Sequence, residues 1–165
     1  MSSWYWLVAG LAVAALATVA CTGGGGEGAS SVGAPSTNLT QTDSGEGGVT
    51  VQVSWLTAAE LEADGDLADA AASYDAASYL LLRVRMDTHS GDLGDYDPAA
   101  GSELVADGGK TQPAVSWLPL SDNAHHRDGV LVFERPRGAG SVQLTLSDLA
   151  GVAQRVFRWA PPPEA

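Results

Sequence analysis

The sequence predicts an all-β fold, an antiparallel β-sandwich of about seven strands. The first observation is a series of short segments in which apolar and polar residues alternate, as in strands with one buried face. The second is the regular spacing of turn residues, mainly Gly, Pro and Asp, between these segments. The third is the proline run at 161–163 that closes the last segment. Together these features are typical of an immunoglobulin-like sandwich.

The first strand and the segment after it have different patterns. Residues 49–55, VTVQVSW, alternate without a break and predict a strand. Thr57 and Glu60 have the spacing of a helix capping box, and an alanine-rich stretch continues from there to Tyr74. We therefore expect one or two short helices, interrupted at Gly65, as an insertion after the first strand.

The second predicted strand, at about residues 78–89, sorts its side chains into two sets. Successive side chains of a strand point to opposite faces, so alternate residues share a face. The apolar set is expected to be buried, and the polar set places Asp87 and His89 on the same side. The apolar set is Leu80, Leu82, Val84 and Met86, and the polar set is Arg83, Arg85, Asp87 and His89.

Further segments complete the predicted sandwich. The DGGK turn at 107–110 predicts a hairpin between the strands that flank it. A continuous apolar run then predicts a strand that is packed on both sides. The predicted strands of this part are 103–106, 111–118, 129–134, 142–147 and 152–159.

The N-terminal part of the chain differs in composition from the rest. Residues 1–20 contain a long uncharged apolar run, which predicts a signal sequence or an uncleaved membrane anchor. This run ends in Thr-Val-Ala-Cys21, which resembles the lipobox of bacterial lipoproteins and implies lipidation of Cys21. Residues 21–47 are rich in Gly, Ser and Thr and predict a flexible tether. One domain at 48–160 and a tail at 161–165 are expected to follow.

The expected location is the cell membrane, where a lipid or an uncleaved anchor holds the domain on the extracytoplasmic side. Cys21 is the only cysteine, so no disulfide can form within the chain. The formal net charge is -12, from 20 acidic and 8 basic residues. Affinity for nucleic acid depends mainly on Lys and Arg, so no nucleic-acid partner is expected.

Four motifs of the predicted domain are similar to those of a group of uncharacterised exported bacterial immunoglobulin-like domains. The resemblance covers most of residues 49–159. It implies the sandwich fold but no established activity. The motifs are DTHSGDL at 87–93, PAVSW at 113–117, HHRDGVLVF at 125–133 and RVFRW at 155–159.

All three histidines fall in two of these motifs. His89 ends a predicted strand, and His125 and His126 lie in the predicted loop before another. Imidazole is a common protein ligand for zinc and copper. Asp87, on the strand face of His89, is expected to act as a fourth ligand or to orient a histidine ring. The sequence therefore predicts a copper or zinc site formed by these four residues.

An alternative interpretation of these residues remains open. The histidine loop can be a solvated loop, with Asp87 and His89 hydrogen-bonded at a strand end. Adjacent residues of a strand point to opposite faces, so His125 and His126 converge on one metal only if the chain turns there. Without a metal, the protein would be a non-catalytic interaction or scaffold module that contacts another exported protein. The chain has no G-x-S-x-G nucleophile motif, and we do not expect an enzyme.

Overall fold

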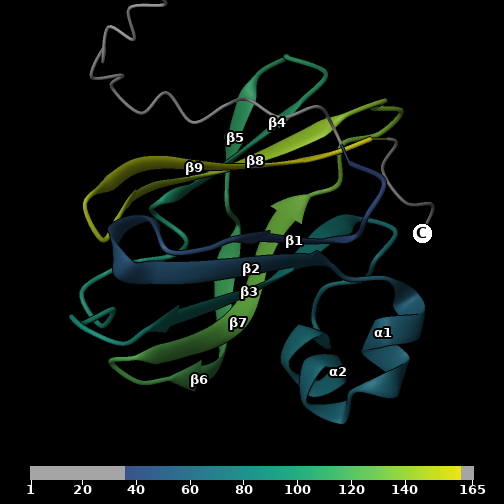
Figure 1. Cartoon of the computed structure of the whole chain (residues 1–165). Coiled ribbons are helices and arrows are strands. Elements are labelled where there is room, and N and C mark those ends of the chain that lie inside the picture. Colours follow the sequence, from purple (N-terminus) through teal and green to yellow (C-terminus); the bar gives the residue numbers. More distant parts are fainter. Residues whose placement is uncertain (1–35, 161–165) are drawn as a thin grey trace, which may run out of the picture.

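Two antiparallel sheets stack face to face and confirm the predicted all-β sandwich (Figure 1). The computed structural model describes residues 36–160 of the chain. One sheet has five strands in the order β1-β2-β3-β7-β6, and the other has four in the order β5-β4-β8-β9. The strands are β1 (Thr40–Asp43), β2 (Val49–Trp55), β3 (Tyr79–Thr88), β4 (Ser102–Ala106), β5 (Thr111–Pro113), β6 (Ser116–Asp122), β7 (His126–Glu134), β8 (Val142–Leu149) and β9 (Val152–Trp159).

The order of the strands is that of an immunoglobulin-like domain. In that fold, strands A, B, E and D form one sheet, and strands C, F and G form the other. The orders β2-β3-β7-β6 and β4-β8-β9 follow this arrangement along the chain. Strands β1 and β5 extend the two sheets at one edge each.

The predicted alternation places the core between the two sheets. Val51 and Val53 of β2 and the apolar set of β3 are at most 1% exposed. Trp55 of β2 and Trp159 of β9 meet edge to face, with ring centroids 5.8 Å apart. Such a contact contributes roughly 0.5–1.5 kcal/mol beyond simple burial. Because the described residues contain no cysteine, packing of this kind holds the sheets together.

The predicted helical insertion is present as two short helices, α1 (Ala58–Ala63) and α2 (Gly65–Ala71). Thr57 and Glu60 form the predicted capping box. Asp64 separates the helices, and its side chain accepts hydrogen bonds from the backbone N–H groups of Asp66 and Leu67. Within residues 36–160, no helix is long and apolar enough to cross a membrane. The predicted signal sequence and Cys21 lie outside the described residues.

The two helices cover one half of the outer face of the five-stranded sheet, the face turned away from the other sheet (Figure 1). Helix α2 packs against β6. The covered half is apolar and forms a second, smaller core. Its buried members are Leu56, Leu67, Ala71, Leu81, Val130 and Val132.

The domain begins earlier than the sequence predicts. Residues 40–43 of the predicted tether form β1, which pairs with β2, and a 3-10 turn, η1 (Glu46–Gly48), follows. The polar composition of this segment predicted a tether, but polar contacts hold residues 40–43 in the fold without apolar burial. The Gln41 side chain donates to the Arg158 carbonyl at 2.6 Å and accepts from the Arg158 N–H at 3.2 Å. The predicted tether residues 21–35 lie outside the described part.

The predicted single strand at 111–118 is also wrong, because the chain changes sheets within it. Strand β5 pairs with β4 as the predicted hairpin, whereas β6 pairs with β7 in the other sheet. Pro113 has no N–H to continue the ladder, and the next paired N–H, that of Val115, donates to the Val132 carbonyl at 2.7 Å. This crossing and β1 account for the additional strands.

Arg155 of β9 ties the end of β1 and the turn that follows it to the four-stranded sheet. The residue is 1% exposed. Its Nη1 lies 2.7 Å from Asp43 Oδ2, and its Nη2 donates to the Glu46 carbonyl. A buried guanidinium without such partners would be strongly unfavourable. The arginine therefore fixes the start of the domain.

We expect Arg155→Ala to lower the free energy of unfolding by about 3–5 kcal/mol, because it leaves the carboxylate of Asp43 without its charged partner. Urea unfolding of the full chain measures the effect. Arg137→Ala is the matched control, because Arg137 is exposed, and its effect should stay within about 0.5 kcal/mol. An equal, small effect of both changes would contradict the role assigned to Arg155.

Candidate functional site

Polar residues occupy the half of the outer face that the helices leave open. The antiparallel register of β3 and β7 places Arg85 opposite Asp128, and Asp87 opposite His126. The side chains of Arg85, Asp87 and His126 are 45%, 53% and 62% exposed. This polar half is the candidate functional site.

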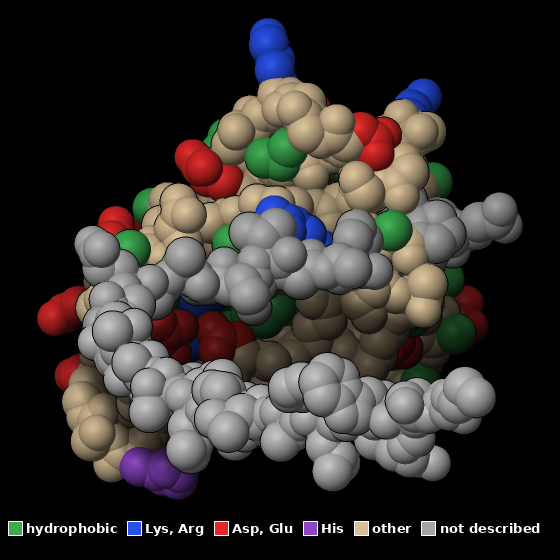
Figure 2. Space-filling model, turned by 45° about the horizontal axis from the view of Figure 1, so that its top comes forward, with side chains coloured by type: hydrophobic (Ala, Val, Ile, Leu, Met, Phe, Trp, Pro, Cys, Tyr) green, Lys and Arg blue, Asp and Glu red, His purple; other side chains and the backbone are tan. Residues whose placement is uncertain are grey.

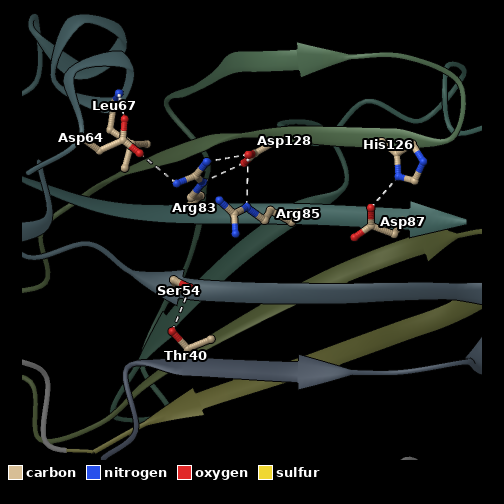
Figure 3. A network of polar contacts seen from close by, with 9 residues as sticks. All are labelled: Thr40, Ser54, Asp64, Leu67, Arg83, Arg85, Asp87, His126 and Asp128. Atoms are coloured by element: carbon tan, nitrogen blue, oxygen red, sulfur yellow. Dashed lines mark hydrogen bonds and ion pairs between the residues drawn. The ribbon is translucent and has the colours of Figure 1, made fainter.

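Asp87 and His126 form a direct pair at the end of this face (Figure 3). The His126 Nδ1 atom lies 2.7 Å from Asp87 Oδ1. When the neutral ring donates its Nδ1–H to the carboxylate, its Nε2 atom carries the lone pair and is open to a ligand. The carboxylate thus contacts the ring of His126, and its role toward a metal stays a prediction.

The three histidines lie at the same end of the β3–β7 pair. The N–H of Thr88, the residue before His89, donates to the His125 carbonyl at 2.9 Å. In Figure 2, the histidine side chains that are visible gather at one corner of the molecule, at the lower left. Among residues 36–160, however, no group of three or more His, Cys, Asp or Glu side chains is arranged to hold a metal ion. The structure brings Asp87 and His126 together, but not the full predicted set.

His89 lies beyond β3, which ends at Thr88. The Thr88 side chain is buried, and its hydroxyl donates to the Gly48 carbonyl at 3.1 Å. Beyond this point the alternation of a strand no longer fixes which way a side chain points. Asp87 pairs across the sheet with His126, which the register sets opposite it, and not along the chain with His89.

Other residues of the two histidine motifs hold the loop after β3. Arg127 is 7% exposed, and its Nη1 donates to the carbonyls of Leu93 and Tyr96. The N–H of Leu93 donates to the Ala124 carbonyl at 2.9 Å. The motifs thus have a structural role: they fix the loop against the start of β7.

Asp128 lies at the centre of a network that sequence analysis missed (Figure 3). It accepts two bonds from Arg83, at 2.9 and 2.7 Å, and a third from Arg85 Nε at 3.2 Å. Arg83 also contacts Asp64, the cap of α2, at 3.3 Å. The shared face of the two arginines was visible in the alternation of β3. The carboxylates that pair with these arginines could not be predicted, because they lie in strands or loops distant in sequence.

These contacts shift the titration of the network. Burial alone would raise the pKa of Asp128, but the hydrogen bond from Arg83 and the charges of Arg83 and Arg85 outweigh it and lower this pKa. The bond to Asp128 is also the main cause that raises the pKa of Arg83. The carboxylate of Asp128 therefore stays ionised to a lower pH than an ordinary aspartate.

A hollow of about 370 Å³ opens beside this network. Ser121 of β6 stands opposite Asp128 in the register of β6 and β7, so the hollow extends across three neighbouring strands. Its lining is polar and carries charges of both signs. The lining residues are Arg85, Asp87, Ser121, His126, Arg127 and Asp128.

Comparisons of the chain with protein-family models, with curated proteins and with solved structures found no match. The resemblance of the motifs to exported bacterial domains therefore stays a prediction. A function has to be argued from the geometry of the site.

We expect Asp128→Asn to lower the free energy of unfolding by about 2 kcal/mol at pH 7, because bonds between charged partners are lost. The folded-state pKa of Asp128 is lowered, so its contribution is complete above the unfolded value of about 3.9 and is lost as the pH falls through the folded value. Urea unfolding at neutral and acid pH should show the two proteins converging in acid. A difference that stays constant with pH would contradict the assignment.

Proposed function

We propose that the protein is a membrane-tethered extracytoplasmic domain that binds a transition-metal ion, copper or zinc, at the histidine end of the β3–β7 pair. The observation that carries this proposal is the 2.7 Å contact between Asp87 and His126. A carboxylate that holds one ring nitrogen, and leaves the other available, is the usual outer partner of a metal-binding histidine. His126 is then the first ligand, through Nε2.

The local backbone supports a contribution from His125 as well. The Asn123 side chain accepts hydrogen bonds from the N–H groups of His125 and His126, at 3.0 and 2.8 Å. The chain therefore turns immediately before β7, which is the condition under which adjacent histidines can approach one ion. His89 follows the neighbouring strand end and is the third ligand in this proposal.

In this proposal, metal binding requires the loops at the ends of β3 and β7 to bring the three histidine rings closer together. Ligand nitrogens must come within about 2.0–2.1 Å of a zinc ion, and the described residues hold no ready group of three ligands. One ring is oriented beforehand, and the other two join as the loops adjust. Part of the binding energy is used for this ordering, which lowers the affinity below that of a rigid site.

Calorimetric titration of the purified full chain with copper and with zinc salts tests the proposal. We expect saturable binding, its loss in His126→Ala, and a roughly 10- to 100-fold weaker affinity in Asp87→Asn, because the carboxylate no longer orients the ring. Asp69→Asn is the matched control, since it removes an exposed carboxylate on α2. No heat at micromolar metal, or binding unchanged in His126→Ala, would overturn the proposal.

A second candidate function is a non-catalytic interaction module that binds an exported partner without metal. The polar hollow beside Arg85 favours it, because this half of the sheet face is not covered by the helices. The absence of metal-dependent heat in the titration would leave this candidate in place.

A further inference from the structure

We propose that the hollow on the outer face of the five-stranded sheet binds a carboxylate group, with Arg85 as its main donor and Ser121 as a second one. This inference does not depend on metal binding. It assigns a ligand chemistry to the surface on which the interaction module would act.

Arg85 presents donors that its neighbours do not use. Its Nε donates to Asp128 Oδ2 at 3.2 Å, which fixes the plane of the guanidinium. Within residues 36–160, neither Nη atom of Arg85 has a hydrogen-bond partner, and the side chain is 45% exposed in the wall of the hollow. A planar guanidinium with two parallel N–H groups matches the two oxygens of a carboxylate.

The charge of Arg85 is the least neutralised in the network. Asp128 receives its shorter bonds from Arg83, at 2.9 and 2.7 Å. Arg127 has its own partner in Asp122, at 2.8 Å. Arg85 therefore has positive charge to offer, a local exception on a chain with a formal net charge of -12.

The surrounding carboxylates restrict which anion fits. Asp87 and Asp128 both line the hollow, and each is already engaged, Asp87 by His126 and Asp128 by the two arginines. A doubly charged phosphate would be repelled by both, with only one unused guanidinium end to compensate. For a singly charged carboxylate, the unused end of the Arg85 guanidinium is sufficient to balance the charge. The Ser121 hydroxyl, on the next strand but one, can donate to the carboxylate or to a neighbouring polar group.

The volume of about 370 Å³ lies at the small end of ligand sites. It suits a carboxylate with a short attached group, such as a peptide C-terminus or a sugar acid. Both sources offer the same chemistry to Arg85, so the test has to separate them.

The test is an NMR titration of the full chain, solubilised in mild detergent, freed of metal on a chelating resin and labelled with ¹⁵N-arginine. The probes are acetate, N-acetyl-Ala-Ala against its C-terminal amide, and glucuronate against glucose. We expect saturable shifts of the Arg85 Nε resonance with the three carboxylates, and none with the amide or with glucose. Tighter binding of the dipeptide acid identifies a peptide C-terminus, tighter binding of glucuronate identifies a sugar acid, and equal binding of all three shows that the carboxylate alone is recognised.

Two arginine variants control the experiment. Arg85→Gln should abolish saturable binding of all carboxylates, followed in this variant by backbone amide shifts of residues around the hollow after uniform ¹⁵N labelling. Arg137→Gln, on an exposed turn residue, should leave binding unchanged. Equal shifts with sodium chloride at the same ionic strength, no shift with any probe, or binding undiminished in Arg85→Gln would overturn the proposal. Because metal is absent throughout, these outcomes are independent of the metal titration.

Discussion

The register between β3 and β7 is the constraint on which both candidate sites depend. These strands lie side by side in the five-stranded sheet, and their pairing sets Asp87 against His126 and Arg85 against Asp128. A slip by one residue would exchange the two faces of β3 and turn its charged residues into the core. The apolar inner residues, among them Leu82 opposite Leu131, forbid this slip. Burial of the core thus fixes the geometry of the polar face.

The helical insertion divides that face into two parts. Under the helices, the outer residues of β3 and β7 are apolar and buried, as at Leu81 and Val132. Beyond the helices they are charged and open to solvent. Arg83 lies at the boundary, since it contacts both the helix cap Asp64 and the strand residue Asp128. Through this arginine, the position of the helices is coupled to the network from which Arg85 extends.

A sandwich without a disulfide needs other links between its sheets. The contact of Trp55 with Trp159 provides one in the core. At the edge, Gln41 and Asp43 of β1 bond to residues of β9 in the other sheet. These polar links lie at the point where the chain enters the domain. In a protein tethered at its N-terminus, as we propose, a pull on the tether would act first on the hydrogen bonds of Ser36 with Arg158 and Ala160, and then on β1 and its contact with Arg155.

The sequence by itself determined the features that depend on neighbours along the chain. Alternation set the inner and outer faces of β2 and β3, and the capping box with the break near Gly65 set two short helices. Only the tertiary structure decided what depends on partners distant in the chain. Edge strand β1 and buried Arg155 are held by each other's polar groups, which no local pattern displays. Asp87 likewise pairs with His126 because the register of β3 and β7 sets the two residues opposite each other, and pairing between strands does not follow chain order.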